Sequence, residues 1–189
     1  MISSGDLKKG IIIELDGQLY QVLDYRHIKM GRGSAQVRLK LRDINAGHTF
    51  ERAFQASEKF IRAHLDYRNM QYLYNDGDLY YFMDEENYEQ IPLSPAHLGD
   101  ALNYLKESMS LQVSSYKGEI LGVELPITIE LKVADTGPGF KGNTATAGTK
   151  PATMETGITI QVPMFISTGD LIKVDTRSGT YLERVSEKS

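Results

Sequence analysis

Short runs of alternating apolar and polar residues, separated by glycine turns, constrain this fold more than any other feature of the sequence. In residues 35–42 every second side chain is apolar: Ala35, Val37, Leu39 and Leu41. This two-residue period is typical of a strand with one buried face. Other runs precede it, including a hairpin that turns at Asp16-Gly17, and no helical period longer than a turn interrupts them. We therefore expect a small barrel of about five short strands in roughly the first 60 residues.

The middle of the chain combines a second hairpin with one helical pattern. Runs 70–74 and 79–83 flank the turn 75–78, which predicts two antiparallel strands. Ser94 and Pro95 then have the character of a helix cap and a first-turn proline. Apolar residues follow at helical spacing: Leu98, Ala101, Leu102 and Leu105. We expect this segment to form the one helix of the chain.

The remaining sequence predicts further strands and a loop. Strands are expected near 111–116, 119–125, 127–133, 158–162, 171–174 and 181–185. A Gly-rich loop is expected from Asp135 to about Glu155. Pro126 marks a border, because proline cannot donate to a strand ladder. The chain is therefore predicted to be all-β, with three small domains that need a neighbour to pack on. Their predicted ranges are 1–64, 65–126 and 127–189.

Charge is distributed unevenly along these three pieces. The formal net charge is −4 for the whole chain, but +4 for residues 1–64, −8 for 65–126 and 0 for 127–189. A basic end beside an acidic middle indicates a protein that presents its first domain to a polyanion. The alternative is that small domains differ in charge by chance.

Composition and missing motifs exclude several classes of function. The chain has no cysteine, which excludes disulfides, thiolate catalysis and Cys-ligated zinc. It lacks the G-x-x-x-x-G-K-[ST] motif of nucleotide hydrolysis, and its histidines lack metal-binding spacing. A G-x-G-x-x-G match at 137–142 is not followed by a helical pattern, so it does not predict a dinucleotide site. We expect a protein that is not an enzyme and that holds no metal or cofactor.

The sequence also predicts where the protein acts. No apolar run approaches the roughly 18 residues that a membrane span needs. The first residues lack the basic and apolar regions of a signal peptide, and the missing cysteines fit a reducing compartment. We therefore expect a cytoplasmic protein with no membrane partner.

A glycine-flanked arginine is the best candidate for a functional side chain. Arg32 lies between Gly31 and Gly33 in a predicted loop, so it is the one long side chain at the apex, where its guanidinium can meet a phosphate or a base. Further basic residues flank this loop: Lys29, Arg38, Lys40 and Arg42. This pattern is typical of contacts with a nucleic-acid backbone. The alternative is a surface hairpin with an incidental arginine.

Four stretches carry a resemblance to a known family. They are residues 1–10, the loop 29–35, the hairpin 70–84 with Tyr88-Glu89-Gln90, and residues 150–169 followed by 175–181. Together they resemble the bacterial elongation factor P family from one end of the chain to the other. The stretch 150–169, which begins Lys150-Pro151-Ala152-Thr153-Met154, is similar to the family signature and is far more specific than a lone glycine motif.

The resemblance implies a fold and a mechanism. It implies an L-shaped molecule made of three β-barrels, a KOW-like, SH3-type barrel followed by two OB-type barrels. It also implies a monomeric factor that binds the ribosome beside peptidyl-tRNA when synthesis stalls on consecutive prolines. Such a factor promotes peptide-bond formation by steadying the CCA end of the tRNA, without hydrolysing a nucleotide.

The resemblance also implies which residues act. Those expected to contact tRNA or rRNA are Lys29, Gly31, Arg32, Gly33, Ser34, Lys40 and Arg42. Many family members carry a modified lysine where this chain has Arg32, and others carry a rhamnosylated arginine, so Arg32 is a candidate for modification by a dedicated enzyme. A codon-side loop is implied at Gly142, Asn143 and Thr144, where many members have Gly-Asp-Thr.

Two alternatives stay open at this point. One is the paralogous elongation-factor-P-like protein, which shares the fold. The other is a general OB-type RNA-binding protein, which is expected to place aromatic residues on a basic groove. The aromatic residues of this chain instead cluster in its most acidic piece: Tyr72, Tyr74, Tyr80, Tyr81 and Phe82.

Overall fold

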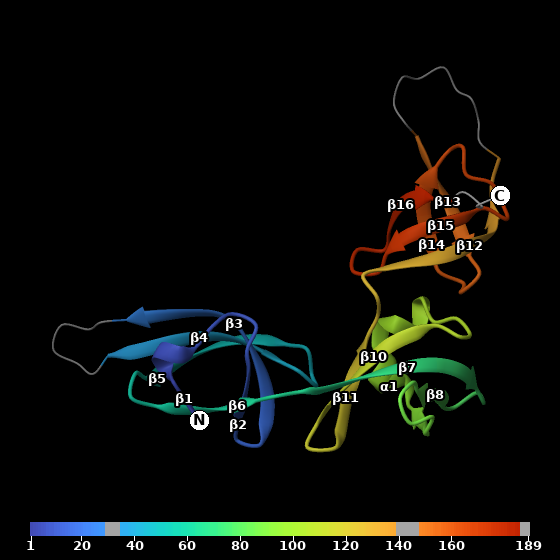
Figure 1. Ribbon diagram of the computed structural model, residues 1–189. Coiled ribbons are helices and arrows are strands. Elements are labelled where there is room, and N and C mark those ends of the chain that lie inside the picture. Colours follow the sequence, from blue (N-terminus) through green and yellow to red (C-terminus); the bar gives the residue numbers. More distant parts are fainter. Residues whose placement is uncertain (29–34, 139–147, 186–189) are drawn as a thin grey trace. The chain divides into compact units, whose positions relative to one another are not determined.

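Three antiparallel sheets form the architecture of the protein (Figure 1). The computed structural model describes residues 1–28, 35–138 and 148–185. Helical structure in this part of the chain is confined to three short segments, and the predicted all-β class is confirmed. The described residues form two compact units, 1–66 with 115–121 and 67–114 with 122–189. The predicted borders at residues 64 and 126 stay a prediction.

The first sheet has six strands, in the order β1-β6-β2-β3-β4-β5. Their bounds are β1 Ile2–Ser3, β2 Ile12–Leu15, β3 Gln18–Ile28, β4 Gln36–Asp43, β5 Thr49–Gln55 and β6 Lys59–Ala63. A 3₁₀ turn, η1 Ser4–Asp6, follows β1. The predicted hairpin at Asp16-Gly17 is confirmed: both residues have positive φ, 52° and 79°, and Leu15 pairs with Gln18. This is a two-residue turn whose backbone twist matches that of the flanking strands.

The alternation of residues 35–42 divides β4 into two faces. Val37, Leu39 and Leu41 are fully buried and pack in one cluster with side chains of β2, β3, β5 and β6. Ala35 precedes the strand and is exposed. Burying a Leu or Val side chain contributes about 1.5–3 kcal/mol, so these three residues fix which face of β4 turns to solvent.

The second sheet has five strands, in the order β11-β10-β7-β8-β9. Their bounds are β7 Asp66–Asn75, β8 Tyr80–Asp84, β9 Gln90–Leu93, β10 Ser110–Tyr116 and β11 Glu119–Glu124. The predicted 70–83 hairpin is confirmed, with Asn75 paired to Tyr80 and Tyr72 paired to Phe82. Strand β9 was not predicted; its sequence, Gln90-Ile91-Pro92-Leu93, is short and contains a proline.

The predicted helix after Ser94 is wrong in its length and period. One α-turn, α1 Pro95–Leu98, ends at Gly99, and a 3₁₀ segment, η2 Gly99–Asn103, follows. Gly99 has φ 50° and ψ −130°, a combination that a helix cannot continue through. The buried side chains are Leu98, Ala101 and Tyr104. Their spacing of three residues is the period of a 3₁₀ helix rather than of an α-helix.

The third sheet has the order β14-β13-β12-β15-β16. Its strands are β12 Thr128–Thr136, β13 Thr149–Met154, β14 Thr159–Pro163, β15 Leu171–Asp175 and β16 Thr180–Arg184. The loop expected from Asp135 to about Glu155 is wrong over β13. The inward face of β13 carries Lys150, Ala152 and Met154, and Lys150 donates from Nζ to the carbonyl oxygen of Gly137 at 2.6 Å. Because the buried face of β13 includes a lysine, the sequence does not show the apolar–polar alternation that indicates a strand.

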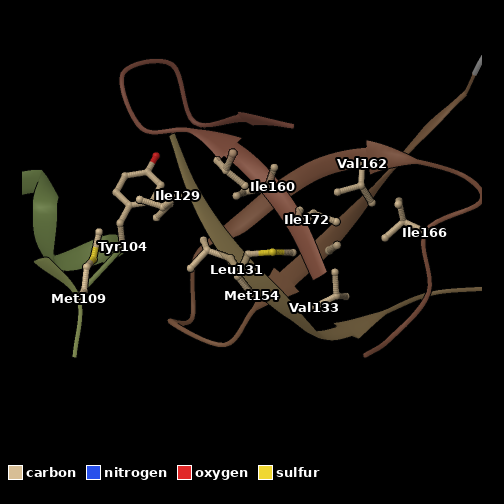
Figure 2. Close-up of a cluster of buried hydrophobic side chains, with 12 residues drawn as sticks. Tyr104, Met109, Ile129, Leu131, Val133, Met154, Ile160, Val162, Ile166 and Ile172 are labelled. Atoms are coloured by element: carbon tan, nitrogen blue, oxygen red, sulfur yellow. The ribbon is translucent and has the colours of Figure 1, made fainter. Parts of the chain in front are cut away.

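The core of the third sheet extends beyond its own strands. Figure 2 shows Ile129, Leu131 and Val133 of β12 beside Met154, Ile160 and Ile172. Tyr104 and Met109, which precede β10 in sequence, belong to the same buried cluster. A small sheet thus gains apolar contacts from a neighbouring segment, as the small size of the predicted domains requires.

The turn between β15 and β16 generates the first testable prediction. Asp175 accepts hydrogen bonds from the Arg177 backbone at 2.8 Å and from its guanidinium Nη2 at 2.7 Å. These bonds, led by the guanidinium, lower the pKa of Asp175 to about 2. A carboxyl whose pKa is lowered by folding stabilises the native state above its unfolded pKa of roughly 4. That stability is lost as the pH falls toward 2.

We therefore expect Asp175→Asn to lower the melting temperature at pH 7. Between pH 4 and pH 2.5 the melting temperature of the variant should fall less steeply than that of the wild type. Thermal melts followed by circular dichroism across this range measure the effect. Glu107→Gln, at an exposed position, is the matched control and should keep the wild-type pH profile. An unchanged profile in Asp175→Asn would contradict the role of this ion pair.

Candidate nucleic-acid interface

The β3–β4 hairpin carries the candidate interface of the first sheet. Ile28 at the end of β3 pairs with Gln36 at the start of β4, so the two strand ends that segment 29–34 joins lie side by side. Five predicted site residues lie outside the described residues: Lys29, Gly31, Arg32, Gly33 and Ser34. The described part of the candidate site is therefore the outer face of the strands next to this segment.

Lys40 and Arg42 lie on that outer face. They alternate with the buried residues of β4, as does Arg38, and all three are exposed. The same alternation that builds the core thus directs three cationic side chains to solvent. The structure brings Lys40 and Arg42 together on one strand, as the sequence predicted.

A second arginine lies across the hairpin from Arg38. In the β3–β4 register Arg26 is the direct partner of Arg38, and the Arg26 side chain is 82% exposed. Like charges directly opposite one another destabilise a strand pair, so this position is an electrostatic cost that the fold tolerates. Paired guanidinium groups are a suitable site for phosphate oxygens. The sequence analysis missed Arg26, because pairing it with Arg38 needs the hairpin register.

Lys40 has a different environment. Its cross-strand partners are Asp24 on β3 and Glu51 on β5, so two acidic residues neighbour it. The Asp24 carboxylate is itself ion-paired with Lys9 at 3.0 Å and with Arg26 at 3.9 Å. Arg42 pairs instead with Gln21 and Thr49, which carry no charge. The three cations of β4 therefore differ in their neighbours: Arg38 has a cationic cross-strand partner, Arg26, whose charge is partly offset by Asp24.

These side chains line a shallow depression of about 250 Å³. Its polar lining is Asp24, Arg26, Arg38, Lys40 and Glu51, and Tyr25 and Ile28 complete it. Lys9 holds Asp24 through a 3.0 Å ion pair and, as the first cause, lowers the pKa of that carboxyl. Asp24 therefore stays charged and, like Glu51, is an acidic residue among the cationic ones that line this depression.

The loop of the third sheet that is predicted to lie on the codon side is flanked by described residues. Gly142, Asn143 and Thr144 lie outside the described residues. Before them, the Thr136 hydroxyl donates to the carbonyl of Pro151 at 2.9 Å and the Gly137 carbonyl accepts from Lys150. The segment that leads into this loop is thus tied to β13, the strand that follows it.

Within residues 1–28, 35–138 and 148–185, no cluster of three or more His, Cys, Asp or Glu side chains is arranged to hold a metal ion. No helix in this described part is long and apolar enough to cross a membrane.

Comparison with known proteins identifies the family. Three family models match successive parts of the chain: the elongation factor P KOW-like domain at residues 3–60, its OB domain at 65–123 and its C-terminal domain at 129–184. The chain belongs to the elongation factor P family. The expected resemblance is thereby confirmed, and with it the KOW-like and OB character of the fold.

Curated members of the elongation factor P family match almost the whole chain. The elongation factor P of Acetivibrio thermocellus is 54% identical over 185 residues, which cover 98% of this chain and 100% of that protein. The elongation factor P proteins of a Thermoanaerobacter species and of Caldanaerobacter subterraneus are 55% identical over the same coverage. This chain is accordingly a translation elongation factor of that family, rather than a general OB-type binder.

Solved structures support the same fold. The chain is similar to translation initiation factor 5A from Methanococcus jannaschii, with a TM-score of 0.53 and 23% identity over 65% of this chain and 92% of that one. An initiation factor 5A family protein from Naegleria fowleri gives a TM-score of 0.53 at 18% identity. At this identity the likeness concerns the fold alone.

The unequal cations of β4 generate a stability prediction. Arg38→Gln removes the repulsion from Arg26, so we expect the free energy of unfolding to stay the same or to rise by up to roughly 1 kcal/mol. Lys40→Gln removes a cation between two carboxylates and should leave stability unchanged or lower it by a similar amount. Urea unfolding at low salt measures both variants. The reverse order of the two would contradict the electrostatic description of this face.

Proposed function

We propose that this factor binds the ribosome beside peptidyl-tRNA and promotes peptide-bond formation at consecutive prolines, with Arg32 steadying the CCA end. The observation that carries the proposal is the match to elongation factor P relatives over 98% of the chain. The exposed arginines Arg26 and Arg38, on the strands that flank the Arg32 segment, support the proposal, because ribosomal RNA and tRNA present a phosphate backbone that attracts cations.

The proposed mechanism is one of positioning. The imino group of proline is a poor nucleophile, and a proline-containing nascent chain is strained at the reacting end. Holding the CCA end lowers the entropic cost of reaching an attack geometry. Arg32 acts as neither acid nor base, since a guanidinium does not deprotonate in this range. Its proposed role is to hold phosphate or sugar groups.

The other predicted residues have supporting roles in this proposal. Lys29 and Ser34 flank Arg32, and Gly31 and Gly33 give the backbone freedom to bring it close to RNA. Lys40 and Arg42 contact phosphates and dock the domain. Gly142, Asn143 and Thr144 contact RNA on the codon side. The Asn143 amide can donate as well as accept hydrogen bonds, so it can bind RNA acceptor groups that a carboxylate cannot.

The proposal extends to two further properties. The factor acts as a monomer, with ribosome and peptidyl-tRNA as its partners. Arg32 is the residue on which a modifying enzyme acts, because it is the one long side chain between two glycines. An intact mass of the native protein reports any group that Arg32 carries.

We expect ribosome binding to weaken with salt, and Lys40→Glu with Arg42→Glu to weaken it further. Losing two phosphate contacts should also reduce the slope of log affinity against log salt concentration by about two. Affinity measured across a salt series tests this. Lys59→Glu with Arg62→Glu, two exposed positions on β6, makes the same charge change as a control.

A graded outcome is expected within β4 itself. Arg38→Gln should weaken ribosome binding more than Lys40→Gln, because both cross-strand neighbours of Lys40, Asp24 and Glu51, are acidic and repel phosphate, whereas Arg38 lies opposite Arg26. If the double glutamate variant kept wild-type affinity and slope, this face would not meet RNA.

We expect Arg32→Ala to lose activity without losing stability. A surface substitution changes the free energy of unfolding by no more than about 0.5 kcal/mol, whereas synthesis through consecutive prolines should slow strongly. Ribosome affinity should fall less, because the other cations still dock the domain. Arg32→Lys should restore activity only in part, since an ammonium cannot replace a planar fork.

Paired melting curves and polyproline synthesis rates test this expectation. Arg62→Ala, an exposed arginine on β6, is the matched control and should keep full activity. Full activity in Arg32→Ala, or a loss explained by unfolding, would overturn the role proposed for Arg32.

A further inference from the structure

The outer face of the second sheet carries a pair of stacked tyrosines, of which Tyr74 is exposed and Tyr81 is half-buried. Tyr74 on β7 and Tyr81 on β8 are direct cross-strand partners, with ring centroids 4.8 Å apart and planes at 18°. Tyr74 is 48% exposed. Pro92 on β9 is the next partner of Tyr81 and is also exposed. The row of Tyr74, Tyr81 and Pro92 is called here the tyrosine face, and its exposed members are Tyr74 and Pro92.

Asp76 fixes the tyrosine face in place. Its Oδ2 accepts from the Tyr81 hydroxyl at 2.9 Å, and its Oδ1 accepts from the backbone N–H groups of Asp78 and Leu79 at 3.0 and 2.8 Å. The hydrogen bond to Asp76 is also the first cause that raises the pKa of Tyr81. The phenol therefore stays protonated, and a carboxylate charge lies directly beside the aromatic pair.

The surroundings of the tyrosine face are acidic. Residues 69–105 contain no Lys or Arg, although the chain has 21 of them, and contain seven Asp or Glu residues. These are Asp76, Asp78, Asp84, Glu85, Glu86, Glu89 and Asp100. Asp78 in the β7–β8 turn is exposed, as are Glu86 and Glu89 in the turn between β8 and β9. The tyrosine face therefore lies on a part of the protein that repels phosphate and attracts cations.

We propose that the tyrosine face binds an arginine-rich segment of a partner protein. A guanidinium placed over the face of a tyrosine is attracted by the ring quadrupole, and arginine also stacks on aromatic rings. The nearby carboxylates of Asp76 and Asp78 complement the positive charge of such a segment. This inference does not depend on the proposed function, because it concerns another sheet and a protein ligand.

Charge argues against a nucleic acid as the occupant. Stacking platforms for single-stranded nucleic acids occur in positively charged grooves that follow the backbone. The outer face of OB strands 2 and 3, formed here by β8 and β9, is the usual position for such ligands. In this protein Tyr81 of β8 stacks with Tyr74 of the adjacent strand β7, but acidic rather than basic residues lie near the pair, so it offers a stacking surface without attraction for phosphate.

The test is an NMR titration of the full-length protein with a peptide of Gly-Arg-Ser repeats. We expect amide shifts concentrated on β7 and β8 around Tyr74 and Tyr81, with weaker binding of a Gly-Lys-Ser peptide of equal length. Tyr74→Ala should weaken binding of the arginine peptide about two- to fivefold, the range of an exposed cation–π contact. Tyr74→Phe keeps the ring and should bind like wild type.

Two further variants test the position of the binding surface and the contribution of its charge. Tyr88→Ala removes a tyrosine that is 71% exposed in the turn after β8 and should leave binding unchanged. Asp78→Lys inverts one exposed charge, leaves the Tyr74–Tyr81 stack in place and should weaken binding. The proposal is overturned if the arginine peptide shifts residues elsewhere or none, if Tyr74→Ala binds as well as wild type, or if oligouridine RNA gives the larger shifts at Tyr74 and Tyr81.

Discussion

The strict alternation of β4 is the constraint on which the first sheet and its proposed interface both depend. Val37, Leu39 and Leu41 have no exposed surface, so the strand cannot slip by one residue without turning them all to water. The same constraint fixes Arg38, Lys40 and Arg42 on the outer face. The hydrophobic effect thus positions charges that take no part in the core.

Cross-strand pairing then determines how strongly each of these charges can act. Arg38 faces Arg26, whereas Lys40 lies between Asp24 and Glu51. The two arginines are each two residues from the strand ends, Ile28 and Gln36, that segment 29–34 connects. Stability alone does not favour two arginines opposite each other, so their pairing beside this segment is consistent with a surface selected for binding. The acidic second sheet, with no Lys or Arg in residues 69–105, directs phosphate binding away from itself.

The sequence predicted the elements whose signals are local. Alternation located β4, and the Asp16-Gly17 dipeptide located a turn with two positive φ angles. It failed where tertiary contacts override the local pattern. Lys150 can be buried because its ammonium donates a hydrogen bond to the Gly137 carbonyl, so the sequence of β13 predicts a loop instead of a strand. Gly99 ends the helix after one α-turn. Arg26 became a site residue only through the hairpin register, which a β-bulge between Val22 and Asp24 shifts by one residue.

Site-specific crosslinking on ribosomes stalled at consecutive prolines tests the proposed contact between residue 32 and the CCA end of peptidyl-tRNA. A photoreactive side chain at position 32 is expected to crosslink to the 3′ end of the tRNA, while the same group at position 62 on β6 is not. Mapping the crosslinked nucleotides by primer extension reads out the contact. Crosslinks from position 32 to other RNA or to protein alone, with none to the tRNA 3′ end, would contradict the account.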